Sequence, residues 1–265
     1  MDTVERSRIA AIGSRKRIMH VARGLLVAIV GLGAAGEAAA QFFDRPPPPD
    51  PRSSREAAAQ DLTGYWVSVV SEYWHLRMLM PPKGNYSLLP LTGEARQLAD
   101  AWEPGDDAGN ECRSYGAAAV MRLPGRLHVQ WADDETLRID IDSGAQTRLL
   151  HFDETEAGPP SRQGHSVAAW VSQSGVEDAR YLEVTTTNML PGYLRKNGVP
   201  HSGDTVMEEH FDVFTEPNGD RWMVITSIIT DPRYLTRPYA VTNHFRQADD
   251  DSGWDPTPCR VDYPR

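Results

Sequence analysis

Apolar and polar positions alternate in short segments along most of the chain after residue 60, and turn-forming residues separate these segments. In Thr205–Phe214, Met207, Glu209 and Phe211 share one face of an extended strand, whereas Glu208 belongs to the opposite, more polar face. Many short strands at such spacing are typical of an all-β fold, so we expect an antiparallel barrel, with a β-sandwich as the alternative. The expected strands are Gly64–Ser71, Ala118–Arg122, Leu127–Trp131, Leu137–Ile141, Thr147–Phe152, Ser166–Val171, Tyr181–Thr187, Thr205–Phe214, Trp222–Thr230 and Thr242–Arg246.

One segment, Pro90–Trp102, has the spacing of a helix instead. Leu91, Leu98 and Trp102 recur there at helical intervals, and the Thr92 side chain can cap the first turn. The sequence therefore predicts a mostly β domain that carries one short helix.

The first 40 residues have the order of a secretory signal peptide. A basic stretch, Arg15–Arg23, precedes the apolar run Leu25–Ala35, and Ala38–Ala40 form a small-residue cleavage pattern. The apolar run is shorter than the roughly 20 residues of a spanning helix, and an uncleaved N-terminal anchor is the alternative. We therefore expect a signal peptide at 1–40, a Pro-rich linker at 41–60 and a single barrel domain at 61–265. The protein would then be periplasmic or secreted.

The net charge of the chain argues against two classes of binding partner. Six of the 27 Lys and Arg residues and three of the 37 Asp and Glu residues lie within 1–40, so the mature chain carries a net charge of −13. Nucleic acids and anionic membranes attract clusters of Lys and Arg, and we expect neither as a partner. No later segment has about 18 consecutive apolar residues, which predicts no membrane span after signal cleavage.

The chain has two cysteines, Cys112 and Cys259. An even number in an oxidising compartment predicts one disulfide, with two free thiols as the alternative. The bond would tie the C-terminal segment to the body of the domain. Neither cysteine belongs to a Cys-x-x-Cys pair, which disfavours a zinc ribbon and c-type haem. We expect no cofactor.

Glu209 is the most unusual candidate, because it lies on the apolar face of its expected strand. A carboxylate on a face that packs into the core is costly unless it is paired or hydrogen-bonded. Burial would also raise its pKa, which suits a general acid or base. The alternative is a structural Glu that is paired with an Arg such as Arg148 or Arg195.

Three histidines could join this carboxylate at one end of a barrel. His165 precedes an expected strand, His201 lies just before the Glu209 strand, and His244 is on the last strand. Glu209 with His165 and His201 could form an acid–base pair. The histidines do not have the close spacing of metal ligands, so we predict no metal.

Two sets of sequence motifs resemble those of known groups of proteins, and they indicate a fold and a class of protein for this chain. Gly64-Tyr65-Trp66 resembles the Gly-x-Trp that opens the first strand of lipocalin-like (calycin) barrels and places a Trp across the closed end. Several further blocks between residues 148 and about 239 resemble, in the same order, an uncharacterised group of secreted bacterial proteins. Those blocks are Arg148–Leu150, Gly164-His165-Ser166 with Trp170, Leu182–Thr186, Pro200-His201-Ser202, Glu209-His210-Phe211, Asp231-Pro232 and Thr236-Arg237-Pro238.

This chain departs from the group at two places. It has Trp170-Val171-Ser172-Gln173 where the group has Trp-Glu-Gly-Asp, and it has His210 where the group has Arg. The resemblance implies a secreted, β-rich domain and supplies no reaction.

Two functions follow from these observations. The first is binding of a small hydrophobic or aromatic molecule in a barrel cavity lined by aromatic side chains. Its candidate contacts are Arg148, Trp170, Asp231 and His244. The second is a periplasmic enzyme, an isomerase, cyclase or hydrolase, that uses a Glu/His acid–base pair in the same cavity. Its candidate catalytic residues are Glu209, His165 and His201.

Overall fold

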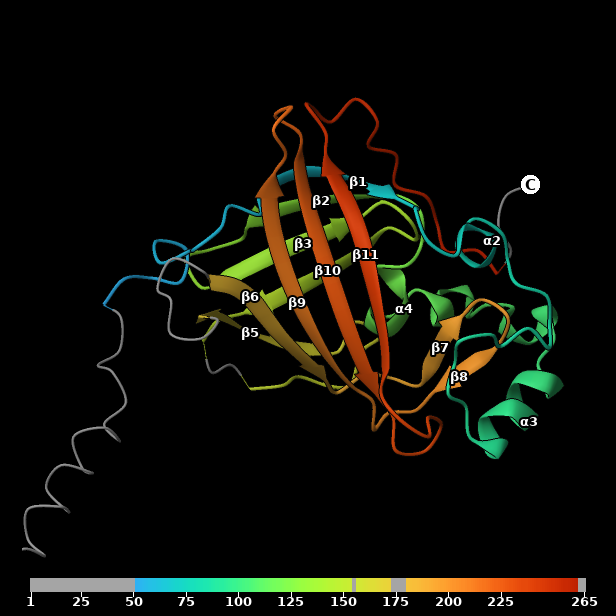
Figure 1. Ribbon diagram of the computed structural model, residues 1–265. Helices are drawn as coiled ribbons and strands as arrows, with labels where there is room; N and C mark the ends of the chain where they lie inside the picture. The colour runs from blue at the N-terminus through green and yellow to red at the C-terminus, as the bar shows by residue number, and fades with distance from the viewer. Residues whose placement is uncertain (1–50, 154–155, 173–179, 262–265) are drawn as a thin grey trace, which may run out of the picture. The chain divides into compact units, whose positions relative to one another are not determined.

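The computed structural model describes residues 51–153, 156–172 and 180–261, which belong to one compact unit, Asp50–Arg265. In this described part, nine strands close a β-barrel in the order β1-β11-β10-β9-β6-β5-β4-β3-β2 (Figure 1). The predicted all-β barrel is therefore confirmed over the sandwich. The predicted signal peptide, 1–40, and the first half of the predicted linker lie outside the described residues.

The strands of the barrel follow the predicted ranges closely. They are β1 (Gly64–Val69), β2 (Arg126–Trp131), β3 (Thr136–Ile141), β4 (Gln146–His151), β5 (His165–Ser172), β6 (Arg180–Thr187), β9 (Val206–Thr215), β10 (Arg221–Thr230) and β11 (Tyr239–Gln247). Neighbouring strands are antiparallel except β4 and β5, which run parallel where Leu150 pairs with Ser166. The barrel is therefore antiparallel around most of its circumference and has one parallel junction.

A group of short elements gathers on one side of the barrel (Figure 1), and we call this group the cap. It consists of α2 (Trp74–Arg77), α3 (Gly93–Ala101), η1 (Pro104–Asp107), η2 (Glu111–Ser114), α4 (Ala117–Val120), β7 (Gly192–Arg195) and β8 (Val199–His201). The helix predicted at Pro90–Trp102 is α3, and the Thr92 side chain accepts a hydrogen bond from the Ala95 amide as expected. The strands β7 and β8, which form a small separate sheet, were not predicted.

The strand predicted at Ala118–Arg122 is wrong, because this segment contains the buried helix α4. The amides of Ala119 and Val120 both bond to the carbonyl of Gly116, which begins the turn. Three consecutive alanines favour a helix, and all four residues of α4 are buried. A short run that is apolar on every side has no period by which sequence alone can separate helix from strand.

The described half of the predicted linker contacts the barrel. The Ser54 amide donates to the Glu135 carboxylate, and Trp170 Nε1 donates to the Ser54 carbonyl at 3.1 Å. The Gln60 side chain bonds to Asp212 and to the Val213 amide. Residues 51–60 therefore belong to the same compact unit as the barrel.

The predicted disulfide is confirmed. Cys112, in η2, is bonded to Cys259, which lies in the segment after β11. The Tyr115 hydroxyl donates to the carbonyl of Arg260 and accepts from its amide. The C-terminal segment is therefore attached to the cap by both a covalent bond and hydrogen bonds.

Candidate functional site

In the described part of the chain, the interior of the barrel contains an apolar cluster and a layer of polar side chains. The cluster includes Trp66, Phe211 and Phe245, each at most 1% exposed, and half-buried aromatic residues such as Trp170 pack against it. Trp66 donates its Nε1 proton to the Leu62 carbonyl at 2.9 Å. Trp170, the aromatic residue that was expected to contact a ligand, therefore packs against the barrel core.

One inward-facing residue from each of six neighbouring strands forms the polar layer. Each of these residues is at most 3% exposed, and together we call them the polar belt: Arg148, Ser166, Thr186, Glu209, Ser227 and Asn243. On β9 the belt residue lies between Phe211, which belongs to the barrel core, and Met207, which belongs to a second apolar cluster shared with the cap. The belt therefore separates two apolar clusters.

Glu209 forms a bidentate ion pair with Arg148 at the centre of the belt. The distances are 2.5 Å from Nη2 to Oε2 and 3.2 Å from Nη1 to Oε1, and both side chains are fully buried. Arg148 also donates to the Thr186 hydroxyl, and the Ser227 hydroxyl donates to Glu209. The predicted inward position of Glu209 is confirmed, and its charge is balanced by one of the two arginines proposed for it.

The two histidines that were predicted to act with Glu209 have other partners. His165 is half-buried and stacks on His151, with ring centroids 5.5 Å apart. His201 is buried in β8, and its Nδ1 bonds to the Ser202 carbonyl at 3.1 Å. Among the described residues, neither imidazole forms a hydrogen bond with Glu209, so the predicted acid–base set is not assembled as one site.

His201 lies in a tightly packed position. A β-carbon added to Gly192, its partner in β7, would lie 2.7 Å from both His201 Nε2 and the Arg113 carbonyl oxygen. Burial lowers the pKa of His201 below its usual 6.5, although the Ser202 carbonyl and Asp231 oppose this effect. The imidazole is therefore neutral in the folded protein near neutral pH.

This depressed pKa predicts acid sensitivity. Below pH 6.5 the unfolded chain takes up a proton that folded His201 resists, so the free energy of unfolding falls as the pH decreases. We expect His201→Asn to reduce the slope of stability against pH between 7 and 5, by at most about 1.4 kcal/mol per pH unit. Urea unfolding across this range measures the slope. The exposed His75, replaced in the same way, is the control, and an unchanged slope in His201→Asn would contradict the assignment.

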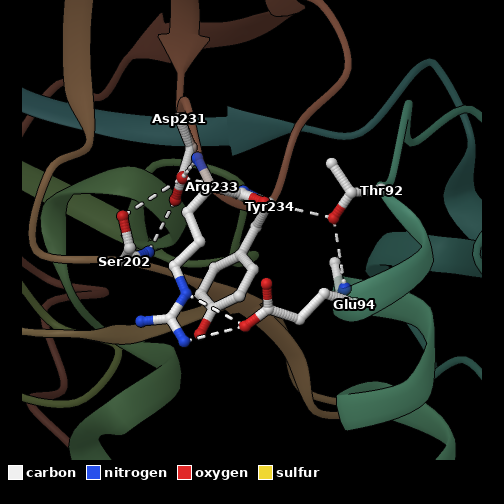
Figure 2. A network of polar contacts seen from close by, with 7 residues as sticks. Thr92, Glu94, Ser202, Asp231, Arg233 and Tyr234 are labelled. Carbon is white, nitrogen blue, oxygen red and sulfur yellow. Dashed lines mark hydrogen bonds and ion pairs between the residues drawn. The ribbon is translucent and has the colours of Figure 1, made fainter.

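Asp231, a predicted ligand contact, is the centre of a network that attaches the cap to the barrel (Figure 2). Its carboxylate accepts hydrogen bonds from the Ser202 amide at 2.6 Å and from the Arg233 and Tyr234 amides at 2.9 Å. Burial alone would raise its pKa, but these hydrogen bonds hold the pKa below the usual value. Arg233 continues the network to Glu94 in the first turn of α3.

Of the remaining predicted contacts, Trp170 is half-buried and stacks on Phe152 with centroids 5.9 Å apart. His244 is half-buried on β11, on the opposite face of the strand from the belt residue Asn243. The structure therefore brings Arg148 and Glu209 together, and it places Asp231, Trp170 and His244 in separate surroundings.

A groove that the sequence did not predict lies where β11 meets the start of the cap. Its volume is about 420 Å³, within the range of small-molecule sites. The lining residues are Glu72, Tyr73, Leu88, Pro90, Arg237, Pro238, Tyr239, Ala240, Val241 and Thr242. A second hollow of about 400 Å³ shares Leu88, Pro90 and Arg237 with it.

Part of the groove wall is a strand edge. The pairing of β1 with β11 begins at Val69 and His244, so the earlier residues of β11, Tyr239–Asn243, extend past the end of β1. These residues pair with β10 on their other side. No described strand pairs with this edge beyond β1, so its backbone donors and acceptors can face a ligand, together with the side chains of Glu72 and Arg237.

Two bulky residues of the groove have a strained backbone. Tyr73 has a φ of 49° and Leu88 a φ of 71°, and their side chains are 47% and 53% exposed. Left-handed conformations cost non-glycine residues about 1–3 kcal/mol and are concentrated at ligand-binding and active sites. No sequence signal could have identified this groove, because Tyr and Leu do not favour positive φ.

Comparisons with protein-family models, curated proteins and solved structures gave no match for this chain. The resemblance to secreted bacterial proteins therefore stays a prediction, and the functional argument depends on the geometry of the described residues.

Proposed function

We propose that this chain is an extracytoplasmic binding protein that holds a small hydrophobic or aromatic molecule in the groove between β11 and the cap. The groove volume and its apolar lining by Tyr73, Leu88, Pro90 and Val241 support this class of ligand. The polar end of such a molecule would face Arg237, Glu72 or the backbone edge of β11. The barrel supplies the rigid wall of the site, and its interior does not take part.

The observation that carries the proposal is the exposed, left-handed backbone at Tyr73 and Leu88. An exposed leucine at positive φ gains little from burial and is strained. A glycine would relieve this strain, since it adopts positive φ readily. Contact with a ligand gives a physical reason for keeping the two side chains there.

Export is part of the same proposal. The disulfide is compatible with an oxidising compartment, and the signal-like order of the first 40 residues supports export. In the described residues no helix is long and apolar enough to cross a bilayer.

The contacts of Glu209 give no support to the enzyme hypothesis. Its two oxygens are held by Arg148 and Ser227 in a fully buried position, where a substrate would have to displace an ion pair. A binding function requires no such rearrangement.

Leu88→Gly tests the groove and is expected to separate affinity from stability. Binding of 1-anilinonaphthalene-8-sulfonate, an aromatic dye, should weaken about tenfold, because one leucine contact contributes about 1.5 kcal/mol. The thermal midpoint should stay the same or rise, because the strain at φ 71° is removed. Dye titration by fluorescence and thermal unfolding measure the two effects.

Leu79→Gly is the matched control, because Leu79 is 58% exposed, does not line the groove and does not have positive φ. We expect this control to keep the affinity for the dye. Equal affinity in wild type and Leu88→Gly, or no saturable binding to the wild type, would contradict the proposed site.

A further inference from the structure

A small cavity where α2, α4 and β7 meet is lined by basic side chains. Arg77, Arg122, Arg195 and Lys196 reach it from these three elements and from the residues next to them, and each is at most 7% exposed. The other lining residues are apolar except the buried Ser114, and none of the described lining residues is acidic. This concentration of positive charge is unexpected in a protein of net charge −10.

Arg195 is the least satisfied member of the group. Its Nη2 donates to the Ser87 carbonyl at 2.8 Å, but its Nε and Nη1 are buried and have no hydrogen-bond partner in the described structure. Two donors of this buried guanidinium therefore form no hydrogen bond with the described residues. Buried polar groups are normally hydrogen-bonded, and a buried charge is costly unless it is paired.

Arg122 adds a second charge beside the first. Within the described residues its guanidinium bonds to a neutral oxygen, the Tyr239 hydroxyl. Burial lowers the pKa of Arg195 and repulsion from Arg122 lowers it further, whereas the neighbouring Tyr239 hydroxyl acts in the opposite direction. Two buried guanidiniums that repel each other, with no carboxylate among the described lining residues, favour an anion in this cavity.

The size of the cavity limits the anion. Its volume is about 20 Å³, which is room for about one water-sized particle. We propose that this cavity binds a single monovalent anion of halide size, with either Arg195 Nε or Arg195 Nη1 as the donor and Arg122 as the second charge. Larger organic anions do not fit this volume.

The proposed anion site is next to the groove but independent of it. Tyr239 lines the groove, and its hydroxyl accepts a hydrogen bond from Arg122. An anion held by Arg122 and Arg195 would therefore stabilise the position of Tyr239 in the wall of the groove, without contacting a ligand there. The proposal of an anion site therefore does not depend on what the groove binds.

Bromide diffraction tests the site directly on the wild-type chain. Crystals grown with bromide as the only halide should show an anomalous peak in the cavity, within hydrogen-bond distance of Arg195 Nε or Nη1. An empty or water-filled cavity at high bromide concentration would overturn the proposal. This measurement does not depend on any variant folding.

Thermal unfolding in solution provides the second test. At constant ionic strength, replacing gluconate by chloride should raise the wild-type midpoint by about 5 °C once chloride exceeds its dissociation constant about a hundredfold. Arg195→Gln should lose this chloride dependence, whereas Arg246→Gln, which changes an exposed arginine, should keep it. Equal midpoints of the wild type in chloride and gluconate would overturn the proposal.

Discussion

Replacing Glu209 by Gln should lower the free energy of unfolding by about 3–5 kcal/mol. The substitution removes the negative charge but leaves Arg148 fully buried, with no carboxylate to balance its own charge. The hydroxyls of Thr186 and Ser227 cannot supply that charge. Urea unfolding of the wild type and the variant measures the difference, and the slope against urea should stay nearly constant.

The neighbouring residue provides a matched control for this experiment. Glu208 lies on the same strand but faces outward and is exposed, so Glu208→Gln should change stability by less than about 0.5 kcal/mol. The double variant Arg148→Met, Glu209→Leu should regain most of the loss, because it removes both charges together. If Glu209→Gln kept wild-type stability, Glu209 would not be a structural partner of Arg148, and its role as an acid or base would have to be considered again.

Removing the disulfide should have an effect of similar size. The bond joins residues 147 positions apart, and constraining so long a loop in the unfolded chain contributes about 4–5 kcal/mol. We expect Cys112→Ser with Cys259→Ser to lose most of this stability. The hydrogen bonds of Tyr115 to Arg260 would remain, so the folded structure should persist at low temperature.

Reduction of the wild type provides the corresponding control without a substitution. Thermal unfolding with and without a reductant should show the same loss, and alkylation should label two cysteines only after reduction. If the fully reduced protein kept its thermal midpoint, the C-terminal segment would be held by its noncovalent contacts alone.

The alternation of apolar and polar residues correctly predicted those features of the fold that depend only on neighbouring residues in the chain. Alternation along Thr205–Phe214 placed Glu209 inside the barrel, because side chains on a strand alternate whatever their tertiary partners are. The choice between Arg148 and Arg195 could not be made, since the register of β4 against the rest of the barrel is not a local property. The structure selects Arg148 and places Arg195 in a different part of the molecule.

The parts that sequence did not predict share a physical cause. The strands β7 and β8 have three or four residues that are all buried, so they show no alternation. The groove depends on Tyr73 and Leu88 adopting backbone angles that neither residue prefers. Its position also depends on β11 extending past β1, which is a result of barrel register.

The position of a ligand cavity could not be predicted from the sequence for the same reason. Sequence identified the apolar and aromatic faces of the strands, and these faces do point inward. Whether inward-facing side chains enclose a cavity or fill the barrel depends on how the strands pack together. In the described part of this protein, the inward-facing apolar side chains pack into the barrel core, and the polar belt lies between that core and the second apolar cluster.

We expect a ligand to bind in the outer groove while the barrel interior stays closed. Backbone amide NMR shifts, followed during titration with 1-anilinonaphthalene-8-sulfonate, test it most directly. We predict that the largest shifts occur at residues 72–73, 88–89, 237 and 239–242, with the amides of Glu209 and Ser227 unaffected. Shifts centred on Glu209, Ser227 and Asn243 would contradict the account, because they would place the ligand inside the barrel.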